Sequence, residues 1–176
     1  MTDVSLRREA DEPTSQRYSR RRREEGGVNG ASELRRVWRL NWLSAIQEFC
    51  DLQGQLAAWL NPNAHNPHFT FIELIECYWD DLLLSADQGG YPARIAEGLL
   101  ADHEAAAVAK FHELVATYDA PAGDNFDHAA ILDDPAWLNV VREAQIARER
   151  LAPLILDPAE KAALSDRSES AYRAWR

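Results

Sequence analysis

Hydrophobic residues recur at three- and four-residue steps between residues 32 and 60, and this period predicts a long amphipathic helix. Its expected inward positions are Leu34, Trp38, Trp42, Ile46, Phe49, Leu52, Leu56 and Leu60. Polar residues such as Ser44, Glu48 and Asp51 occupy the opposite face. The helix is expected to end at Asn61, because the following Pro62 cannot continue it.

A second helix is predicted from Phe71 to Leu84, and its start is the strongest local signal in the chain. Thr70 and Glu73 have the spacing of a capping box, in which both side chains accept hydrogen bonds from free backbone N–H groups. The expected inward positions are Phe71, Leu74, Ile75, Tyr78 and Leu82. Two successive glycines, Gly89 and Gly90, then interrupt the pattern.

The rest of the chain predicts further helices mainly through their start signals. The expected segments are 92–99, 102–118, a short turn at 128–132, 135–151 and a terminal helix from 158. The expected N-caps are Asp102, Asp127, Asp134 and Asp157, the last two followed directly by proline. No run of alternating β-branched residues indicates a strand. The sequence therefore predicts an all-α protein, an irregular multi-helix bundle of about five to six helices.

Residues 1–30 differ from the rest because they are polar and charged, with Tyr18 as their only aromatic residue. Such a segment buries too little apolar surface to offset the entropy of ordering it. We therefore expect a flexible, Arg-rich basic arm over 1–30 and a single helical domain over 31–176. The run Arg20–Arg23 suits contact with an anionic surface, but two glutamates follow at once, and a solvated tail is the simpler interpretation.

The charge of the chain is divided unevenly. Residues 1–40 hold ten arginines against seven acidic residues, a net charge of +3, whereas residues 41–176 hold nine basic against twenty-two acidic residues, a net charge of −13. Between residues 73 and 134, fourteen acidic residues stand against Arg94 and Lys110 alone. This balance predicts no binding to nucleic acid and none to an anionic membrane, and it favours a basic partner.

Composition and cysteines indicate the compartment. Hydrophobic residues make up 46% of the chain, enough for a core, but no apolar run approaches the roughly 20 residues of a membrane span. Cys50 and Cys77 fall inside predicted amphipathic helices, where a free thiol behaves as a small hydrophobic group. No uninterrupted apolar segment follows the basic N-terminal region, as an export signal would require. A reducing, cytoplasmic location is expected.

The first candidate site is an acidic cluster on the second predicted helix. Glu73, Glu76 and Asp80 stand at i, i+3 and i+7 and share one face, with Asp81 beside them and Trp79 next to Asp80. Like charges so placed repel one another, and no Lys or Arg occurs on this part of the chain to compensate them. These five residues are predicted to bind a partner. The alternative is that the carboxylates are solvated or meet Arg94, Arg142 or Arg148 in the fold.

The second candidate site is a metal centre built on histidine. His65 and His68 are spaced so that two imidazoles can reach one metal ion, with Glu73, Glu76 or Cys77 as further ligands, or one of the glutamates as a general base. That set would support a metal-dependent hydrolase. The signal is weak, because no zinc-protease, EF-hand, phosphate-loop or nucleophile-elbow motif occurs.

The interpretation favoured by the sequence is a non-enzymatic, acidic helical interaction protein that binds a basic macromolecule. In size and charge the chain resembles small acidic immunity proteins that block cationic toxins or nucleases, a likeness in bulk properties that involves no motif. No catalytic residue, resident metal or cofactor is expected on this interpretation. The metal-dependent hydrolase is the alternative, and a homo-oligomer built through aromatic helix faces also stays open.

Overall fold

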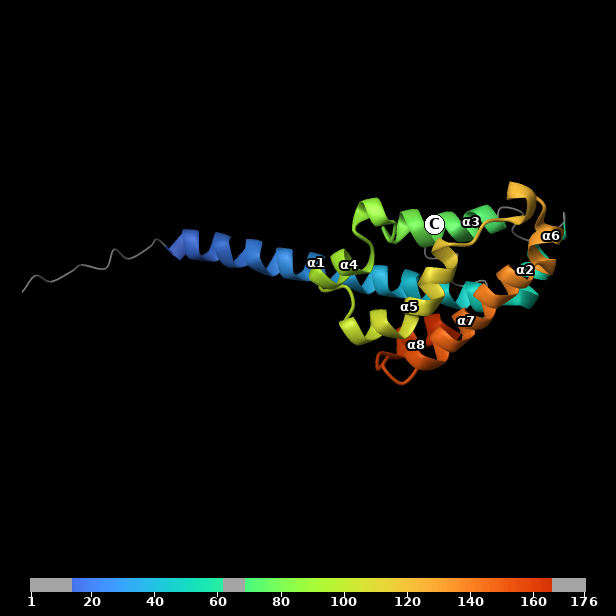
Figure 1. Cartoon of the computed structure of the whole chain (residues 1–176). Helices are drawn as coiled ribbons and strands as arrows, with labels where there is room; N and C mark the ends of the chain where they lie inside the picture. The colour runs from blue at the N-terminus through green and yellow to red at the C-terminus, as the bar shows by residue number, and fades with distance from the viewer. Residues whose placement is uncertain (1–13, 62–68, 166–176) are drawn as a thin grey trace, which may run out of the picture. The chain divides into compact units, whose positions relative to one another are not determined.

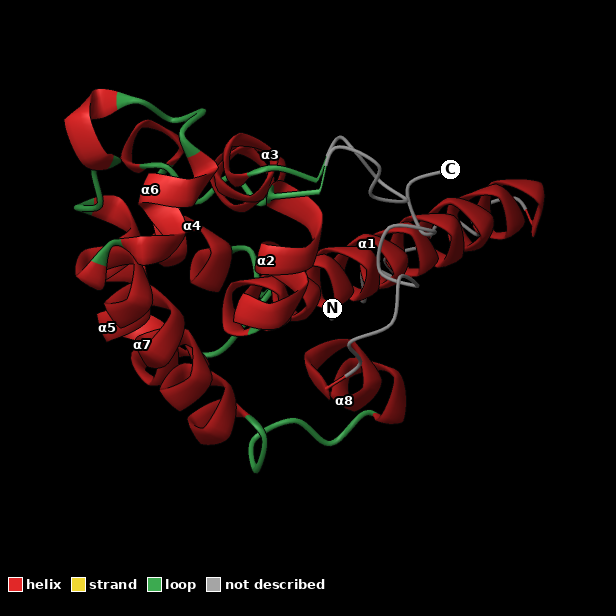
Figure 2. Cartoon of the chain, turned by 90° about the vertical axis from the view of Figure 1, so that its right-hand side faces the viewer, coloured by secondary structure: helices red, strands yellow, loops and turns green. Residues whose placement is uncertain are grey.

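The computed structural model describes residues 14–61 and 69–165, with side chains from residue 30 onward. Contacts divide the chain into two units, Met1–Arg35 and Arg36–Arg176. Every regular element in the described residues is helical (Figures 1 and 2), which confirms the all-α class for this part of the chain. The α-helices are α1 (Thr14–Cys50), α2 (Leu52–Trp59), α3 (Phe71–Glu76), α4 (Gly90–Ala96), α5 (Asp102–Ala116), α6 (His128–Asp133), α7 (Pro135–Leu151) and α8 (Pro158–Ser165). Three short helices of other types are η1 (Cys77–Asp81), η2 (Ala86–Gln88) and η3 (Pro121–Gly123).

The expected N-terminal arm belongs to the first unit. Residues 1–13 lie outside the described residues, and from Thr14 the backbone forms part of α1. The flexibility of the arm and its role therefore stay predictions, as does the division of the chain at residue 30.

The helix expected over 32–60 is interrupted, so this prediction is wrong in detail. α1 ends at Cys50, and α2 starts after Asp51, whose carboxylate accepts a hydrogen bond from Gly54 N at 3.1 Å. Gln55 Nε2 donates to the carbonyl oxygen of Glu48 at 2.9 Å, which satisfies a group that the break leaves open. Asp51, which was expected only as part of the polar face of one long helix, is thus the N-cap of α2.

The second predicted helix changes type halfway. Thr70 caps α3 as expected, with its hydroxyl oxygen 3.3 Å from Glu73 N. After Glu76 the chain winds into a π-helix, η1, instead of continuing as an α-helix to Leu84. Leu84 N donates to the Trp79 carbonyl oxygen at 3.0 Å, a hydrogen bond across five residues. The long α-helix expected over 71–84 is therefore an α-helix followed by a π-helix.

The later helix starts agree largely with the sequence. The carboxylates of Asp127, Asp134 and Asp157 cap the helices that follow them and accept hydrogen bonds from backbone N–H groups at 2.8 to 3.0 Å. Asp102 is not a cap. The cap position is Ala101, whose N–H donates to the Glu104 carboxylate at 2.8 Å.

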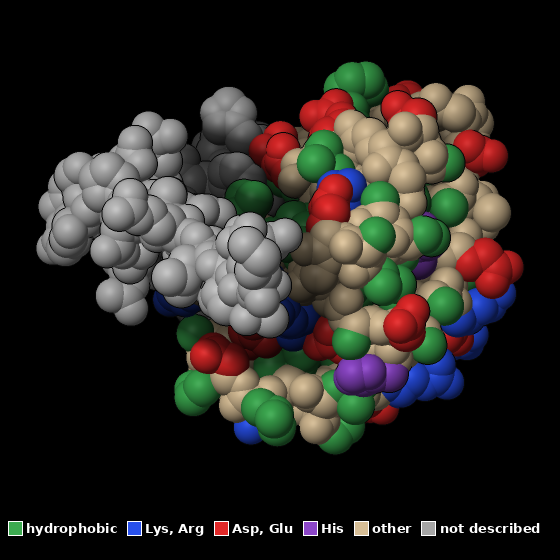
Figure 3. Space-filling view, turned by 90° about the vertical axis from the view of Figure 1, so that its left-hand side faces the viewer, with side chains coloured by type: hydrophobic (Ala, Val, Ile, Leu, Met, Phe, Trp, Pro, Cys, Tyr) green, Lys and Arg blue, Asp and Glu red, His purple; other side chains and the backbone are tan. Residues whose placement is uncertain are grey.

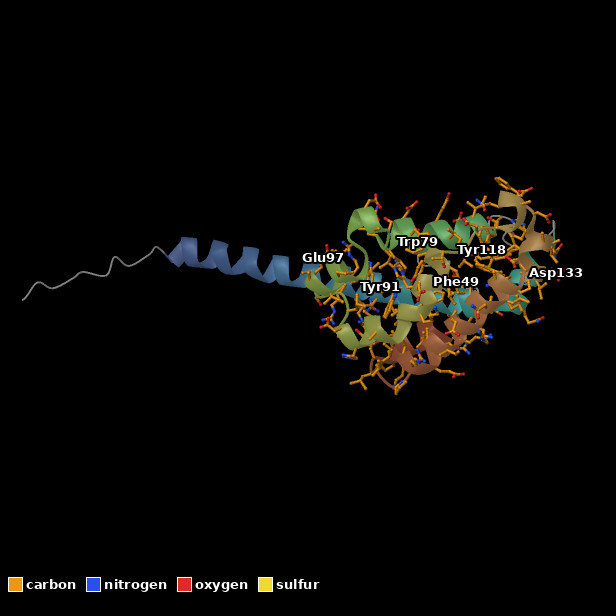
Figure 4. All side chains as sticks on the ribbon, viewed as in Figure 1. Phe49, Trp79, Tyr91, Glu97, Tyr118 and Asp133 are labelled. Carbon is orange, nitrogen blue, oxygen red and sulfur yellow. The ribbon has the colours of Figure 1, made fainter. Side chains whose placement is uncertain are left out.

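The core of the second unit is an aromatic cluster around Phe49. Its ring contacts Tyr78, Phe111 and Trp137 at centroid distances of 5.4, 5.0 and 5.8 Å, which joins α1, η1, α5 and α7. Figure 4 labels Phe49 in the middle of these helices. Most positions predicted to face inward are buried or half-buried, but Leu34 and Leu60 are exposed.

A buried arginine holds three helices of this unit together. Arg39 Nη2 lies 2.7 Å from Glu104 Oε1, and Arg39 Nε lies 2.6 Å from Glu160 Oε1. Arg39 Nη1 also donates to the Leu99 carbonyl oxygen at 3.2 Å. In Figures 1 and 2, α3 and α8 lie on opposite sides of α1. Arg39 thus ties α8 and α5 to one side of α1, and α3 and η1 cover the other.

Candidate functional site

The five predicted partner-binding residues lie on α3 and η1. Glu76, Asp80 and Asp81 are exposed, and Glu73 and Trp79 are half-buried. None of these carboxylates forms an ion pair with a basic side chain within residues 30–61 and 69–165. We call this set of five residues the acidic face.

The arginines that were alternative partners for these carboxylates are engaged elsewhere. Arg94 Nη2 lies 3.0 Å from Glu97 Oε1. Arg148 Nη1 donates to Gln47 Oε1 at 2.9 Å, and Arg142 contacts Asn139 and its neighbour Glu143. The fold therefore leaves the acidic face without the compensation that these three arginines were considered to give.

The π-helix η1 positions Trp79 between the core and the surface. The indole packs edge-on against Tyr78 and His112, with both centroid distances at 5.1 Å. Just after η1, Leu83 has a φ of 55°, a left-handed conformation that costs a bulky side chain about 1–2 kcal/mol. Its side chain is nevertheless 42% exposed. A π-helix and a strained residue so close together are typical of functional segments.

Behind the acidic face, four polar aromatic side chains form a hydrogen-bonded chain. Trp42 Nε1 donates to the Tyr91 hydroxyl at 2.8 Å, and the hydroxyls of Tyr91 and Tyr78 are 3.2 Å apart. The Tyr78 hydroxyl lies 3.0 Å from His112 Nδ1. Figure 4 labels Trp79 on η1 and Tyr91 on α4, on the same part of the second unit.

Sequence reasoning missed Tyr91 and His112 as members of the site. Tyr78 is separated from Tyr91 by 13 residues and from His112 by 34, so no local pattern links them.

Burial sets the protonation of these groups. Burial lowers the pKa of His112. Burial also raises the pKa of Tyr78, and the interaction with the neighbouring Tyr91 raises it further. Burial also raises the pKa of Tyr91 to about 12, although its hydrogen bonds with Tyr78 and Trp42 oppose this rise. All three side chains are therefore neutral near pH 7.

A second group of acidic side chains lies between α1 and α3. Burial raises the pKa of Glu48 to about 8, and the negative charge of Glu73 contributes. Burial raises the pKa of Cys77 to about 12, with further contributions from Asp81, Glu73 and Glu48. At neutral pH the Cys77 thiol is therefore protonated and is a poor nucleophile and metal ligand.

The predicted metal centre is only partly accessible to comparison with the structure. His65 and His68 lie outside the described residues. Among the residues that the structure does describe, no three His, Cys, Asp or Glu side chains are arranged to hold a metal ion. Glu73 and Glu76 are on α3, with Glu73 in its first turn. The metal-dependent hydrolase stays a hypothesis.

Comparison with known proteins gives no relative from which a function can be transferred. No family model, no curated protein and no solved structure matches the chain. Within the described residues, no helix has the length and apolar character required to cross a membrane.

Proposed function

We propose that this protein binds a basic macromolecular partner through the acidic face. The observation that carries the proposal is the exposure of Glu76, Asp80 and Asp81, with no basic side chain of the described residues paired to them. Like charges placed close together on a helix repel one another and destabilise it. A cationic partner would supply the compensating positive charge that the fold does not place beside these carboxylates.

Two further features support docking at this face. The half-buried Trp79 gives a rigid aromatic contact beside the carboxylates, and aromatic anchors surrounded by charge are common in protein interfaces. Figure 3 shows acidic side chains along the upper edge of one face of the molecule, and others beside the basic ones on its right and lower parts. The excess of acidic over basic residues in residues 41–176 accelerates the encounter with a basic partner.

The most specific form of the proposal is an inhibitor or immunity-type protein that neutralises a cationic toxin or nuclease. The support for this form is the small size of the chain and its net charge of −10. Its activity would be stoichiometric binding, with no catalytic step and no cofactor. A low-salt pull-down from the protein's own cell extract, eluted in steps of increasing salt and analysed by mass spectrometry, identifies the partner. The expected result is one basic protein released at moderate salt in near-equal amount.

The test is charge reversal at the exposed end of the face. We expect Asp80→Lys combined with Asp81→Lys to weaken partner binding by about 10- to 100-fold, because both changes replace attraction by repulsion. The matched control is Asp119→Lys with Asp133→Lys, which makes the same change of net charge at two other exposed positions. Figure 4 shows Asp133 well away from Trp79. Equal affinities for the two double variants, both folded by circular dichroism, would show that the acidic face is not the docking site.

A further inference from the structure

The hydrogen-bonded chain behind the acidic face has a direction, which its inner end determines. Trp42 carries only an N–H, so its Nε1 donates to the Tyr91 oxygen, 2.8 Å away. The Tyr91 proton is then directed to the Tyr78 oxygen at 3.2 Å, and the Tyr78 proton to His112 Nδ1 at 3.0 Å. In this direction every donor has an acceptor. His112 is then the neutral tautomer with its proton on Nε2.

The opposite direction leaves a buried hydroxyl without an acceptor. A proton on His112 Nδ1 forces Tyr78 to accept from the imidazole and to donate to Tyr91. Tyr91 then accepts from both Tyr78 and Trp42, and its own proton has no acceptor among the residues described. Tyr91 is buried, so water does not replace the missing bond. Protonation of His112 is therefore opposed at the far end of the chain as well as at the imidazole.

The surroundings of His112, on α5, are aromatic and uncharged. Tyr78 and Trp79 face it from η1 at centroid distances of 5.9 and 5.1 Å, and Tyr91 faces it from α4 at 4.8 Å. The titratable groups among these neighbours are the two tyrosines, which stay protonated at neutral pH. Burial alone lowers the pKa of His112, with no contribution from a charged side chain of the described residues.

We propose that His112 senses protons, and that its protonation reverses the chain through Tyr78 and Tyr91 to Trp42 and rearranges η1. Tyr78 and Trp79 both belong to η1 and both contact the imidazole, Tyr78 by a hydrogen bond and Trp79 by ring packing, so protonation of His112 acts on η1 through two contacts. The segment also carries Asp80 and Asp81. The proposed relay thus connects acidification to the geometry of the acidic face, with a positive charge added behind it.

The test of the relay is a pH titration of the full chain by NMR. Spectra of the indole N–H groups and of the histidine rings are recorded from about pH 7.5 to about pH 5, the range that brackets imidazole titration. We expect the Trp42 indole signal to shift with the midpoint of His112, although Trp42 is fully buried and three hydrogen bonds away. A Trp42 signal that stays constant while His112 titrates overturns the relay.

Variants within the chain separate a relay from a local effect. Tyr78→Phe keeps the ring that packs on Phe49 but removes the middle hydroxyl, and we expect His112 to titrate while Trp42 no longer follows. Tyr91→Phe gives the same uncoupling by an independent change. The control His103→Gln alters an exposed histidine on the same helix and leaves the Trp42 titration unchanged. A Trp42 titration that persists in both phenylalanine variants contradicts the relay.

The effect of the relay on binding rests on the proposed function and is measured separately, with a nona-arginine peptide as the probe. We expect the peptide to bind at least about threefold more weakly at about pH 5.5 than at about pH 7.5, and His112→Gln to remove most of this difference. Because Glu48 titrates near pH 8, the comparison is repeated with Glu48→Gln. Absence of peptide binding at both pH values contradicts the docking surface and leaves the NMR result intact. Equal binding at both pH values contradicts only the link between the relay and the face.

Discussion

At the scale of single residues, the structure separates carboxylates that water stabilises from those that the fold has to accommodate. Asp80 and Asp81 are exposed. Glu48, on the polar face of α1, is half-buried and feels the charge of Glu73 on α3. Burial and the charge of Glu73 raise its pKa to about 8, so its carboxyl group carries a proton at neutral pH.

Glu48 predicts a pH dependence of stability. Its pKa is raised from 4.5 in the unfolded chain to about 8 in the folded one, so its stabilising contribution is complete below about pH 4.5 and is lost as the pH rises through 8. Glu48→Gln keeps the shape and removes the charge. We expect it to raise the free energy of unfolding at about pH 8 by about 1–2 kcal/mol, and to change it little at about pH 5.

Urea unfolding at the two pH values measures this difference, with Glu149→Gln as the control. Glu149 lies on α7, is exposed and is not part of the acidic face, so the control should behave like the wild-type chain at both pH values. An equal effect of Glu48→Gln at the two pH values would mean that Glu48 ionises normally in the folded protein.

At the scale of elements, local signals predicted where helices begin better than how they continue. The caps Thr70, Asp127 and Asp134 depend on side chains within three residues of the helix start, so the sequence alone predicts them. The break after Cys50 depends on Gln55, which reaches back to α1 and also accepts a hydrogen bond from Trp137 Nε1 at 3.0 Å. That second contact crosses 82 residues, and no periodicity predicts it.

The candidate site shows the same division. The exposure of Glu76 and Asp80 follows from their polarity and spacing, and the structure agrees. The hydrogen-bonded chain from Trp42 to His112 depends on how four helical segments pack. Tyr78 joins it from a π-helix, in a stretch where the hydrophobic pattern predicted an α-helix. Hydrophobic period identifies which residues are buried, but it does not identify which buried hydroxyls meet.

The end of η1 gives a prediction about strain. Leu83 has a positive φ and is 42% exposed, so a residue that tolerates this conformation loses little burial and gains relief of strain. We expect Leu83→Asn to raise the free energy of unfolding by about 0.5–1 kcal/mol. Leu156→Asn is the control, because Leu156 is more exposed and has an ordinary negative φ. If Leu83→Asn destabilises the protein in thermal unfolding, contacts of the leucine outweigh the strain.

At the scale of the whole molecule, Arg39 is buried while many of the acidic side chains are exposed to solvent. Arg39 is 7% exposed and binds both Glu104 and Glu160. Burial by itself raises the pKa of Glu104, but the hydrogen bonds from Arg39 and from Ala101 N, together with the positive charge of Arg39, outweigh it, and the net effect is a lowered pKa. Three helices far apart in sequence therefore depend on one guanidinium group.

Removal of this group should be among the most damaging single changes in the second unit. We expect Arg39→Met to lower the free energy of unfolding by about 3–5 kcal/mol, because two carboxylates lose the arginine that pairs with them while remaining largely buried. Arg39→Lys restores the charge but not the planar fork, and we expect it to recover only part of the loss. Urea unfolding followed by far-UV circular dichroism measures both variants.

The control for Arg39 is Lys110→Met, which breaks the exposed pair with Glu113. An exposed pair of this kind contributes at most about 0.5 kcal/mol. If Arg39→Met cost no more than the control, α8 would have to be held by its apolar contacts alone.

The ion pair between Arg39 and Glu160 also has a consequence for synthesis of the chain on the ribosome. Arg39 is made early, Glu104 follows much later, and Glu160 comes near the end of the described residues. Until then Arg39 lacks one of its two carboxylate partners. The second unit can therefore complete its contacts only after residue 160 has left the exit tunnel.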